Sequence, residues 1–252
     1  MKIALIGDVH ANLPALETVL QHARENHVEA IWNVGDSVGY GPFPDEVVLR
    51  LQQENVTSLI GNYDLKVLDF PKNRKKFKKN KRPEKFLAFQ WAYEHLSSPS
   101  RQYLESLSKE LWLQVLNRQI LLVHASLSSN EELLTPGTPK AHLKDLAKKA
   151  AHQNPNAAGI DIIIFGHSHQ PFARLVAGVW FINPGSVGRP GDGDPRASYA
   201  LLELDVHAIQ VEHYRLDYDI QAAVLAVREK GLPEAFAQML LHGVELDEAL
   251  TK

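Results

Sequence analysis

The sequence predicts an α/β protein in which helices cover a central sheet. Short apolar runs alternate with stretches of helical periodicity through the first third of the chain, which is the pattern of β-α-β units. Residues 160–165 are nearly all β-branched, which is typical of a strand buried on both faces. Polar side chains of the metal-ligating type follow the end of each early strand. The same segments therefore predict both the fold class and a candidate site at the strand ends.

Composition sets the scale and excludes several kinds of chemistry. The 252 residues suit one large domain, and 44% hydrophobic with 23% charged residues is an ordinary globular balance. The chain has no Cys, which excludes disulfides, thiolate metal sites and a Cys nucleophile, and which fits a cytoplasmic location. A net charge of -3 argues against binding polyanions by bulk electrostatics. We expect no membrane partner, because the chain shows neither a signal peptide nor a spanning segment.

Three strands and two helices are predicted in the first third. The loop over 37–44 is rich in Gly and Pro, which lets backbone approach a ligand closely. The predicted elements are a strand over 2–6, a helix over 13–26 capped by Asn12, a strand over 30–34, a helix over 45–54 capped by Asp45, and a strand over 57–60.

The composition then changes. Residues 72–85 are strongly basic, and we interpret them as a solvated surface insertion within a single domain spanning 1–252. The alternative is a basic lip that attracts a phosphorylated substrate or nucleic acid, which we favour less. The remaining predicted elements are helices over 84–96, 99–107, 139–152 and 220–230, strands over 111–115, 119–123, 160–165, 172–176, 179–182, 198–205 and 208–214, and a polar C-terminal tail.

Ligand-type side chains follow five strand ends. Three carboxylates, four imidazoles and one neutral amide suit two divalent ions with mixed nitrogen and oxygen ligands, whereas an all-oxygen Mg²⁺ site needs no His. One carboxylate must bridge two ions held about 3.5–4 Å apart, and Asp36, alone between two ligand pairs, suits that place. The candidates are Asp8, His10, Asp36, Asn62, Asp64, His124, His167 and His169.

These motifs resemble those of calcineurin-like metallophosphoesterases in order and spacing. The matching motifs are Asp8-x-His10, Gly35-Asp36, Gly61-Asn62-x-Asp64, His124 and Gly166-His167-Ser168-His169. The loop Asn183-Pro184-Gly185-Ser186 resembles one in the small prokaryotic phosphodiesterase branch. The resemblance implies a four-layer α/β/β/α sandwich with two mixed central sheets. It also implies two metal ions, with Mn the first expectation and Fe, Ni or Zn as alternatives. The first ion would take Asp8, His10, Asp36 and His169, and the second Asp36, Asn62, His124 and His167.

One position departs from the family pattern. The usual signature is Gly-Asn-His-Asp, whose His gives a proton to the leaving group and is oriented by the Asp. Here Tyr63 takes that place beside Asp64. An unperturbed Tyr has a pKa of about 10 and is a poor acid near neutral pH. The departure favours diesters, activated esters or phosphoanhydrides, whose leaving groups need less help. A packing role that supports Asp64 is the alternative for Tyr63.

The sequence thus predicts an enzyme, a dinuclear-metal phosphoesterase that acts on small soluble phosphates or nucleotides. The catalytic candidates are Asn62, Tyr63, Asp64 and His124, and the substrate-binding candidates are Asn62 and Arg189. Arg189 follows the Asn-Pro-Gly-Ser turn and is suited to a bidentate phosphate contact. Two alternatives stay open: a phosphomonoesterase, such as a protein Ser/Thr phosphatase or a dinucleoside tetraphosphate hydrolase, and a non-catalytic metal-containing binding module. The sequence leaves the oligomeric state open.

Overall fold

Two five-stranded sheets face each other at the centre of the computed structural model, which describes residues 1–155 and 159–251. The first sheet has the order β10-β9-β1-β2-β3 and the second the order β4-β5-β6-β8-β7. Each combines three parallel strands with antiparallel neighbours. The strands are β1 Lys2–Ile6, β2 Ala30–Asn33, β3 Thr57–Ser58, β4 Glu110–Val115, β5 Arg118–Val123, β6 Ile162–Ile164, β7 Phe172–Val176, β8 Val179–Asn183, β9 Ala197–Leu204 and β10 Ile209–Leu216.

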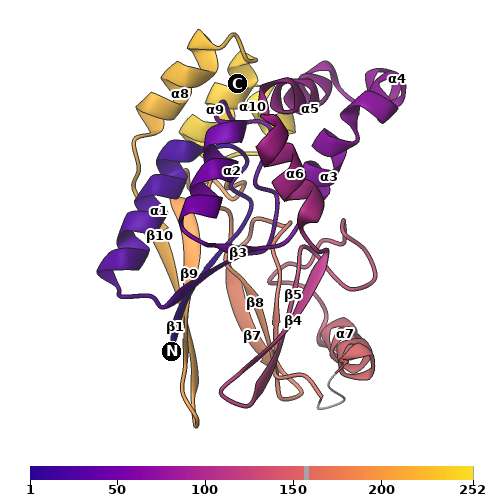
Figure 1. Cartoon of the computed structure of the whole chain (residues 1–252), viewed down its shortest axis with the longest axis vertical. Coiled ribbons are helices and arrows are strands. Elements are labelled where there is room, and N and C mark those ends of the chain that lie inside the picture. Colours follow the sequence, from indigo (N-terminus) through magenta and orange to yellow (C-terminus); the bar gives the residue numbers. More distant parts are fainter. Residues whose placement is uncertain (156–158, 252) are drawn as a thin grey trace.

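Helices complete the four layers that were predicted. Alternate residues of a strand face opposite sides of its sheet. In β1, Ile3 and Leu5 pack between the sheets against residues of β5 and β6, whereas Ala4 and Ile6 pack against α1 (Leu13–Glu25) and α2 (Pro44–Gln53). On the far side, α7 (Lys140–Gln153) covers the outer face of the second sheet (Figure 1). The α/β/β/α sandwich with two mixed sheets is confirmed.

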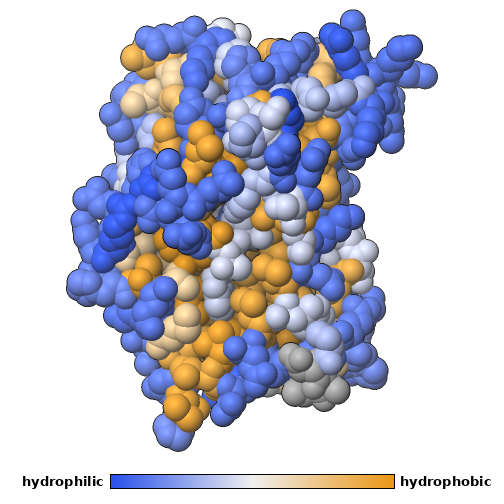
Figure 2. Space-filling model, viewed as in Figure 1, coloured by the Kyte–Doolittle hydropathy of each residue, from blue (hydrophilic) through white to orange (hydrophobic). Residues whose placement is uncertain are grey.

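Two local features differ from the predictions. The basic stretch is helical: α4 (Phe70–Asn80) and the start of α5 (Pro83–His95) cover it, flanked by α3 (Asn62–Leu68) and α6 (Ser98–Ser106). Phe70 and Phe77 anchor α4 in an apolar cluster while its lysines stay exposed, and hydrophilic residues cover this part of the surface (Figure 2). Asp45 does not cap α2, because Pro44 starts the helix and the Asp45 carboxylate accepts a hydrogen bond from Ser97 N instead.

The prediction of a polar C-terminal tail is wrong. The helix predicted over 220–230 is α8 (Ile220–Glu229), and the segment after it forms two more helices, α9 (Glu234–His242) and α10 (Leu246–Ala249). In α9 the buried residues Phe236 and Leu240 lie four residues apart, the spacing of one helical face. The Phe236 ring meets the Tyr40 ring edge to face with centroids 5.2 Å apart. The C-terminal helices therefore pack against the loop over 37–44.

No helix among the described residues is long and apolar enough to cross a membrane.

The contact between the C-terminal helices and the loop should be worth several kcal/mol. We expect Phe236→Ala to lower the free energy of unfolding by about 3–5 kcal/mol, because Phe236 is buried and its removal leaves a cavity. Urea denaturation followed by circular dichroism measures this loss. Leu225→Ala on α8 is the matched control, since Leu225 is 55% exposed and should change stability by less than about 0.5 kcal/mol. Equal effects of the two variants would contradict a buried contact at Phe236.

Candidate metal centre

The predicted ligands meet where the carboxyl ends of strands from both sheets face each other. Asp8, His10 and Asp36 follow β1 and β2 of the first sheet, while His124 and His167 follow β5 and β6 of the second. The two sheets are packed with these strand ends at the same end of the sandwich. Residues far apart in the sequence are therefore brought together across the layers.

The ligand-type atoms form two groups. Within each group they all lie within 4.8 Å of one another. In the first group His169 Nε2 lies 3.3 Å from both Asp8 Oδ1 and His10 Nε2. In the second, Asn62 Oδ1 lies 3.0 Å from His124 Nε2 and adds a neutral oxygen. The groups are Asp8, His10 and His169, and Asp36, His124 and His167.

Asp36 lies between the two groups. Its Oδ2 is 3.8 Å from His10 Nε2 and 3.5 Å from His124 Nε2. Its other oxygen, Oδ1, accepts a hydrogen bond of 2.7 Å from Tyr63 N. A carboxylate held by one oxygen and shared by two sets of ligands is placed as a bridging ligand would be.

The hydrogen bonds of the His124 and His169 rings direct each Nε2 atom into the site. A backbone carbonyl can only accept, so His124 Nδ1 donates to Val34 O and His169 Nδ1 donates to Arg189 O. With Nδ1 as the donor, Nε2 is the ring atom that faces the nearby carboxylate and amide oxygens, and it is the atom that can bind a metal ion. Asp8 Oδ1 is also buried without a hydrogen bond in the described part of the chain. Ring nitrogens and carboxylate or amide oxygens that face one another in a buried site fit a divalent cation as their common partner. The hydrogen bonds to backbone carbonyls orient the rings, as they do in many metal sites.

Burial and charge set the protonation of these groups. Burial lowers the pKa of His10 to about 3, so this ring is neutral, as a metal ligand must be. Burial alone would also lower the pKa of His124, but the Asp36 carboxylate outweighs it and raises that pKa to about 9. Burial opposes ionisation of Asp36 as well, yet His124 outweighs it and lowers the carboxyl pKa. A cation bound beside Asp36 would thus replace a proton on His124.

The backbone is strained at most of these positions. Left-handed φ values cost roughly 1–3 kcal/mol at a non-glycine residue, although Asp and His tolerate them better than most. Gly61 shows how tightly the loops meet, since a Cβ there would overlap Asp36. Such strain gathers at functional sites, because tight turns aim the side chains inward. The strained residues are Asp8 (φ 52°), His10 (47°), Asp36 (54°), His167 (66°) and His169 (57°).

A cleft of about 400 Å³ opens beside the two groups. Tyr63 lies in its wall and shares a hydrogen bond of 2.8 Å between its hydroxyl and that of Tyr40. Burial raises the pKa of Tyr63 well above 10, so its hydroxyl stays protonated near neutral pH. The lining residues are Asp36, Tyr63, Lys85, Leu133, Thr135, His167, Ser168, His169, Gln170, Arg189, Gly191 and Glu245.

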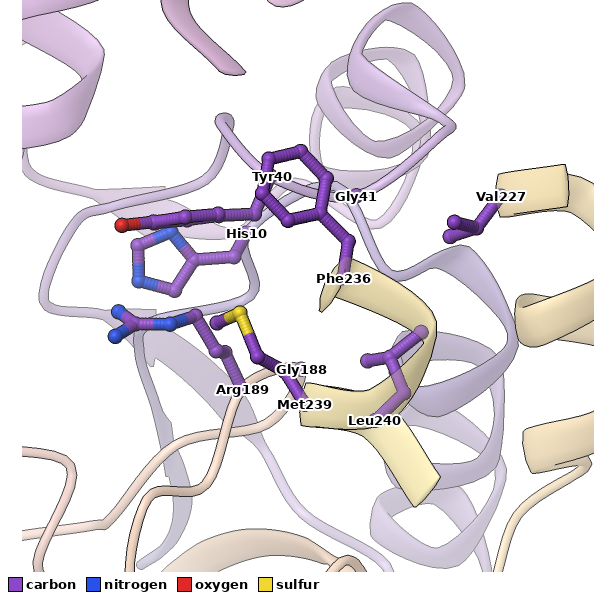
Figure 3. A pocket seen from close by; sticks show the side chains of 9 residues that line it. All are labelled: His10, Tyr40, Gly41, Gly188, Arg189, Val227, Phe236, Met239 and Leu240. Atoms are coloured by element: carbon purple, nitrogen blue, oxygen red, sulfur yellow. The ribbon is translucent and has the colours of Figure 1, made fainter. Parts of the chain in front are cut away.

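Arg189 lies in the wall of this cleft. The Arg189 guanidinium lies 4.5 Å from the Tyr40 ring centre. The polar ends of His10, Tyr40 and Arg189 point to one side, away from apolar side chains of α8 and α9 (Figure 3).

The Asp64 carboxylate accepts hydrogen bonds from Gly61 N and Val38 N, and burial raises its pKa to about 7. Asp64 therefore holds together the loops after β2 and β3.

Three charged or aromatic residues at the site were not singled out by the sequence analysis: Lys85 and Glu245, which line the cleft, and Tyr40, which hydrogen-bonds to Tyr63. Tyr40 was placed only within a Gly-rich and Pro-rich loop, and its position between Gly39 and Gly41 was the available signal. Lys85 was one of many cations in the basic stretch. Glu245 belonged to the supposed tail, where the four-residue apolar spacing was the missed signal.

Comparison with known proteins identifies the family. The calcineurin-like phosphoesterase superfamily domain matches residues 1–207. The chain belongs to this superfamily. This phosphoesterase is 30% identical to the uncharacterised protein MJ0912 of Methanocaldococcus jannaschii, over 96% of the present chain and 98% of MJ0912. It is 26% identical to phosphodiesterase YfcE of Escherichia coli K12, over 83% of the chain and 91% of YfcE.

Solved structures agree with this assignment. A metallophosphoesterase from Sphaerobacter thermophilus has a TM-score of 0.72 and 32% identity, with 97% of this chain and 100% of that chain covered. The hypothetical protein PH1004 of Pyrococcus horikoshii has a TM-score of 0.84 at 21% identity, covering 97% of this chain and 99% of its own, and supports the fold. The predicted family and enzyme class are confirmed: this phosphoesterase is a phosphoester hydrolase with two groups of candidate metal ligands.

Proposed function

We propose that this phosphoesterase holds two divalent ions, preferably Mn, and hydrolyses phosphodiester or phosphoanhydride bonds of small cytoplasmic substrates by in-line attack of water. The first ion would be held by Asp8, His10, Asp36 and His169, and the second by Asp36, Asn62, His124 and His167. The observation that carries the proposal is the position of Asp36 Oδ2 between His10 Nε2 and His124 Nε2. When bound, the ions would supply Lewis acidity that activates water and neutralises phosphoryl charge.

The residues of the chain would bind and orient the phosphoryl group. Asn62 suits its place because an amide oxygen ligates without adding negative charge near an anionic substrate. Its Nδ2 is only weakly engaged, at 3.5 Å from Glu131 Oε1, and can donate to a phosphoryl oxygen. Arg189 offers donors to substrate phosphate in general from the cleft wall, where it is buried and its charge is little screened, and binding of the scissile group does not depend on it.

The choice of bond follows from the side chains near the leaving group. Tyr63 occupies the place of the usual acid, and its protonated hydroxyl can donate a hydrogen bond. Its high pKa makes it a weaker general acid for a departing alkoxide than a group whose pKa lies near neutral pH. Diesters with good leaving groups and phosphoanhydrides depend less on such a transfer. These substrates therefore fit the cleft chemistry better than alkyl monoesters do.

The proposal is tested by metal analysis of the purified protein and a hydrolysis panel with Mn²⁺. We expect about two ions per chain and a kcat/KM at least about tenfold higher for bis(4-nitrophenyl) phosphate than for an alkyl phosphate monoester, because the monoester needs the missing acid. Nucleotides and dinucleotides extend the panel. Activity should vanish with EDTA and return with Mn²⁺. Faster cleavage of alkyl monoesters, or full activity without metal, would refute the proposal.

A further inference from the structure

The wall of the cleft beside His169 carries two cations that the proposed hydrolysis of a single phosphate does not require. Lys85 and Arg189 line the same cleft, from α5 and from the loop after β8. Lys85 Nζ forms no ion pair with the residues that the structure describes. Lys85 is also the third residue of α5, where the helix dipole disfavours a cation. Neither an ion pair nor the helix dipole therefore stabilises the Lys85 charge at this position.

The donors of Arg189 are only partly used. Arg189 is 8% exposed, and its Nε–H is buried without a hydrogen-bond partner among the described residues. A buried donor that lacks a partner is costly unless a ligand supplies one. The guanidinium face rests on the Tyr40 ring, which fixes the group while leaving its edge free to bind an anion.

An anion from the chain itself already lies at this position. The Glu245 carboxylate, which precedes α10, pairs with Arg189 Nη2 and approaches His169 Nδ1 to 4.0 Å. The Glu245 side chain is 53% exposed, in contrast to 9% for Arg189. An ion pair with one exposed member is readily exchanged for another anion. Glu245 thus marks an anion-binding position next to the candidate metal ligands.

The two cations also act on each other. Burial lowers the pKa of Lys85, and the nearby charge of Arg189 lowers it further. Two cations that face one cleft, with the Glu245 carboxylate paired to only one of them, favour a ligand with more negative charge than Glu245 carries. A phosphate group, with oxygens for both cations, has that chemistry.

We infer that Lys85 and Arg189 form a subsite for a second phosphate group of the substrate, which displaces the Glu245 carboxylate when it binds. This inference rests on the proposed function, since it places the scissile phosphate at the metal groups and the second phosphate on the wall beside His169. The substrate class is then a phosphodiester or phosphoanhydride that carries a further phosphate group.

A matched pair of chromogenic diesters tests the subsite. Thymidine 5′-(4-nitrophenyl phosphate) and its 3′-phosphate share the leaving group and differ only in the second phosphate. We expect the kcat/KM of the Mn²⁺-loaded enzyme to be about tenfold higher for the 3′-phosphate, mainly through KM, since one charge-assisted contact is worth about that factor. Lys85→Met should remove most of this preference. Lys78→Met on α4 is the control, because Lys78 is an exposed lysine outside the cleft. It should leave kcat/KM unchanged for both substrates.

Glu245 provides an opposite test of the same subsite. Glu245→Gln removes the competing carboxylate, so the preference for the 3′-phosphate should rise by about threefold or more. A preference that is unchanged in Lys85→Met, or that falls in Glu245→Gln, would overturn the inference.

Equilibrium binding separates the subsite from the metal-dependent activity. Metal-free protein should bind thymidine 3′,5′-bisphosphate more tightly than thymidine 5′-monophosphate in isothermal titration calorimetry, and Lys85→Met should reduce the difference. If the loaded enzyme cleaves neither diester while this Lys85-dependent binding persists, the proposed hydrolysis fails and the subsite stands. If both diesters are cleaved equally and binding is independent of Lys85, the subsite fails and the hydrolysis stands.

Discussion

Asp36→Asn should reduce kcat/KM for diesters by about 10³-fold or more, because the proposed bridging carboxylate would hold both ions and each would contribute several kcal/mol to transition-state stabilisation. Metal content should fall from about two ions per chain to one or fewer. The Oδ1 contact with Tyr63 N would persist in part, since an amide oxygen can also accept. Steady-state kinetics and elemental analysis of the same preparation measure both effects.

Asp145→Asn is the control for the loss of one carboxylate. Asp145 lies on the exposed face of α7, does not line the cleft, and pairs loosely with Lys148 at 3.9 Å. The Asp145→Asn variant should keep full activity and full metal content. An Asp36→Asn protein with unchanged metal and unchanged activity would show that the dinuclear arrangement is wrong.

Tyr63→His should raise kcat for alkyl phosphate monoesters by about 10²-fold, the lower end of what a positioned general acid contributes. The imidazole would stand in the cleft wall where the Tyr63 ring now lies, 5.2 Å from the His10 ring centre. Hydrolysis of 4-nitrophenyl esters should change by less than about threefold, because their leaving group needs little protonation. Kinetics on matched alkyl and 4-nitrophenyl monoesters give the comparison.

Tyr63→Phe distinguishes the effect of a new proton donor from the effect of losing the Tyr63 hydroxyl. It keeps the ring and removes the hydroxyl that hydrogen-bonds to Tyr40. Monoesterase activity should not rise in this variant. A gain equal to that of Tyr63→His would mean that the Tyr40–Tyr63 hydrogen bond, and not the absence of an acid, limits the wild type.

Local patterns predicted the elements whose apolar spacing is strong. The strand over 2–6, the hairpin near 111–123 and the helix near 139–152 were found within one or two residues of their structural bounds. The prediction failed in α4, where the apolar signal is sparse, and in the C-terminal segment, where a short apolar spacing was missed. In α4 only Phe70 and Phe77 are buried among many lysines, and the tail helices are short. Propensity decides little in such segments, since packing onto the rest of the fold supplies their stability.

The sequence by itself determined the family, the fold class and the candidate ligands, because ligand-type residues must directly follow strands and the chain order of such motifs is visible without a structure. The tertiary structure alone decided which groups meet across long separations in the chain. Asp36 lies between His10 and His124, Tyr63 contacts Tyr40, and Glu245 reaches Arg189. These contacts depend on how two sheets and a C-terminal helical segment pack, and packing between distant segments leaves no periodic pattern in the sequence of either one.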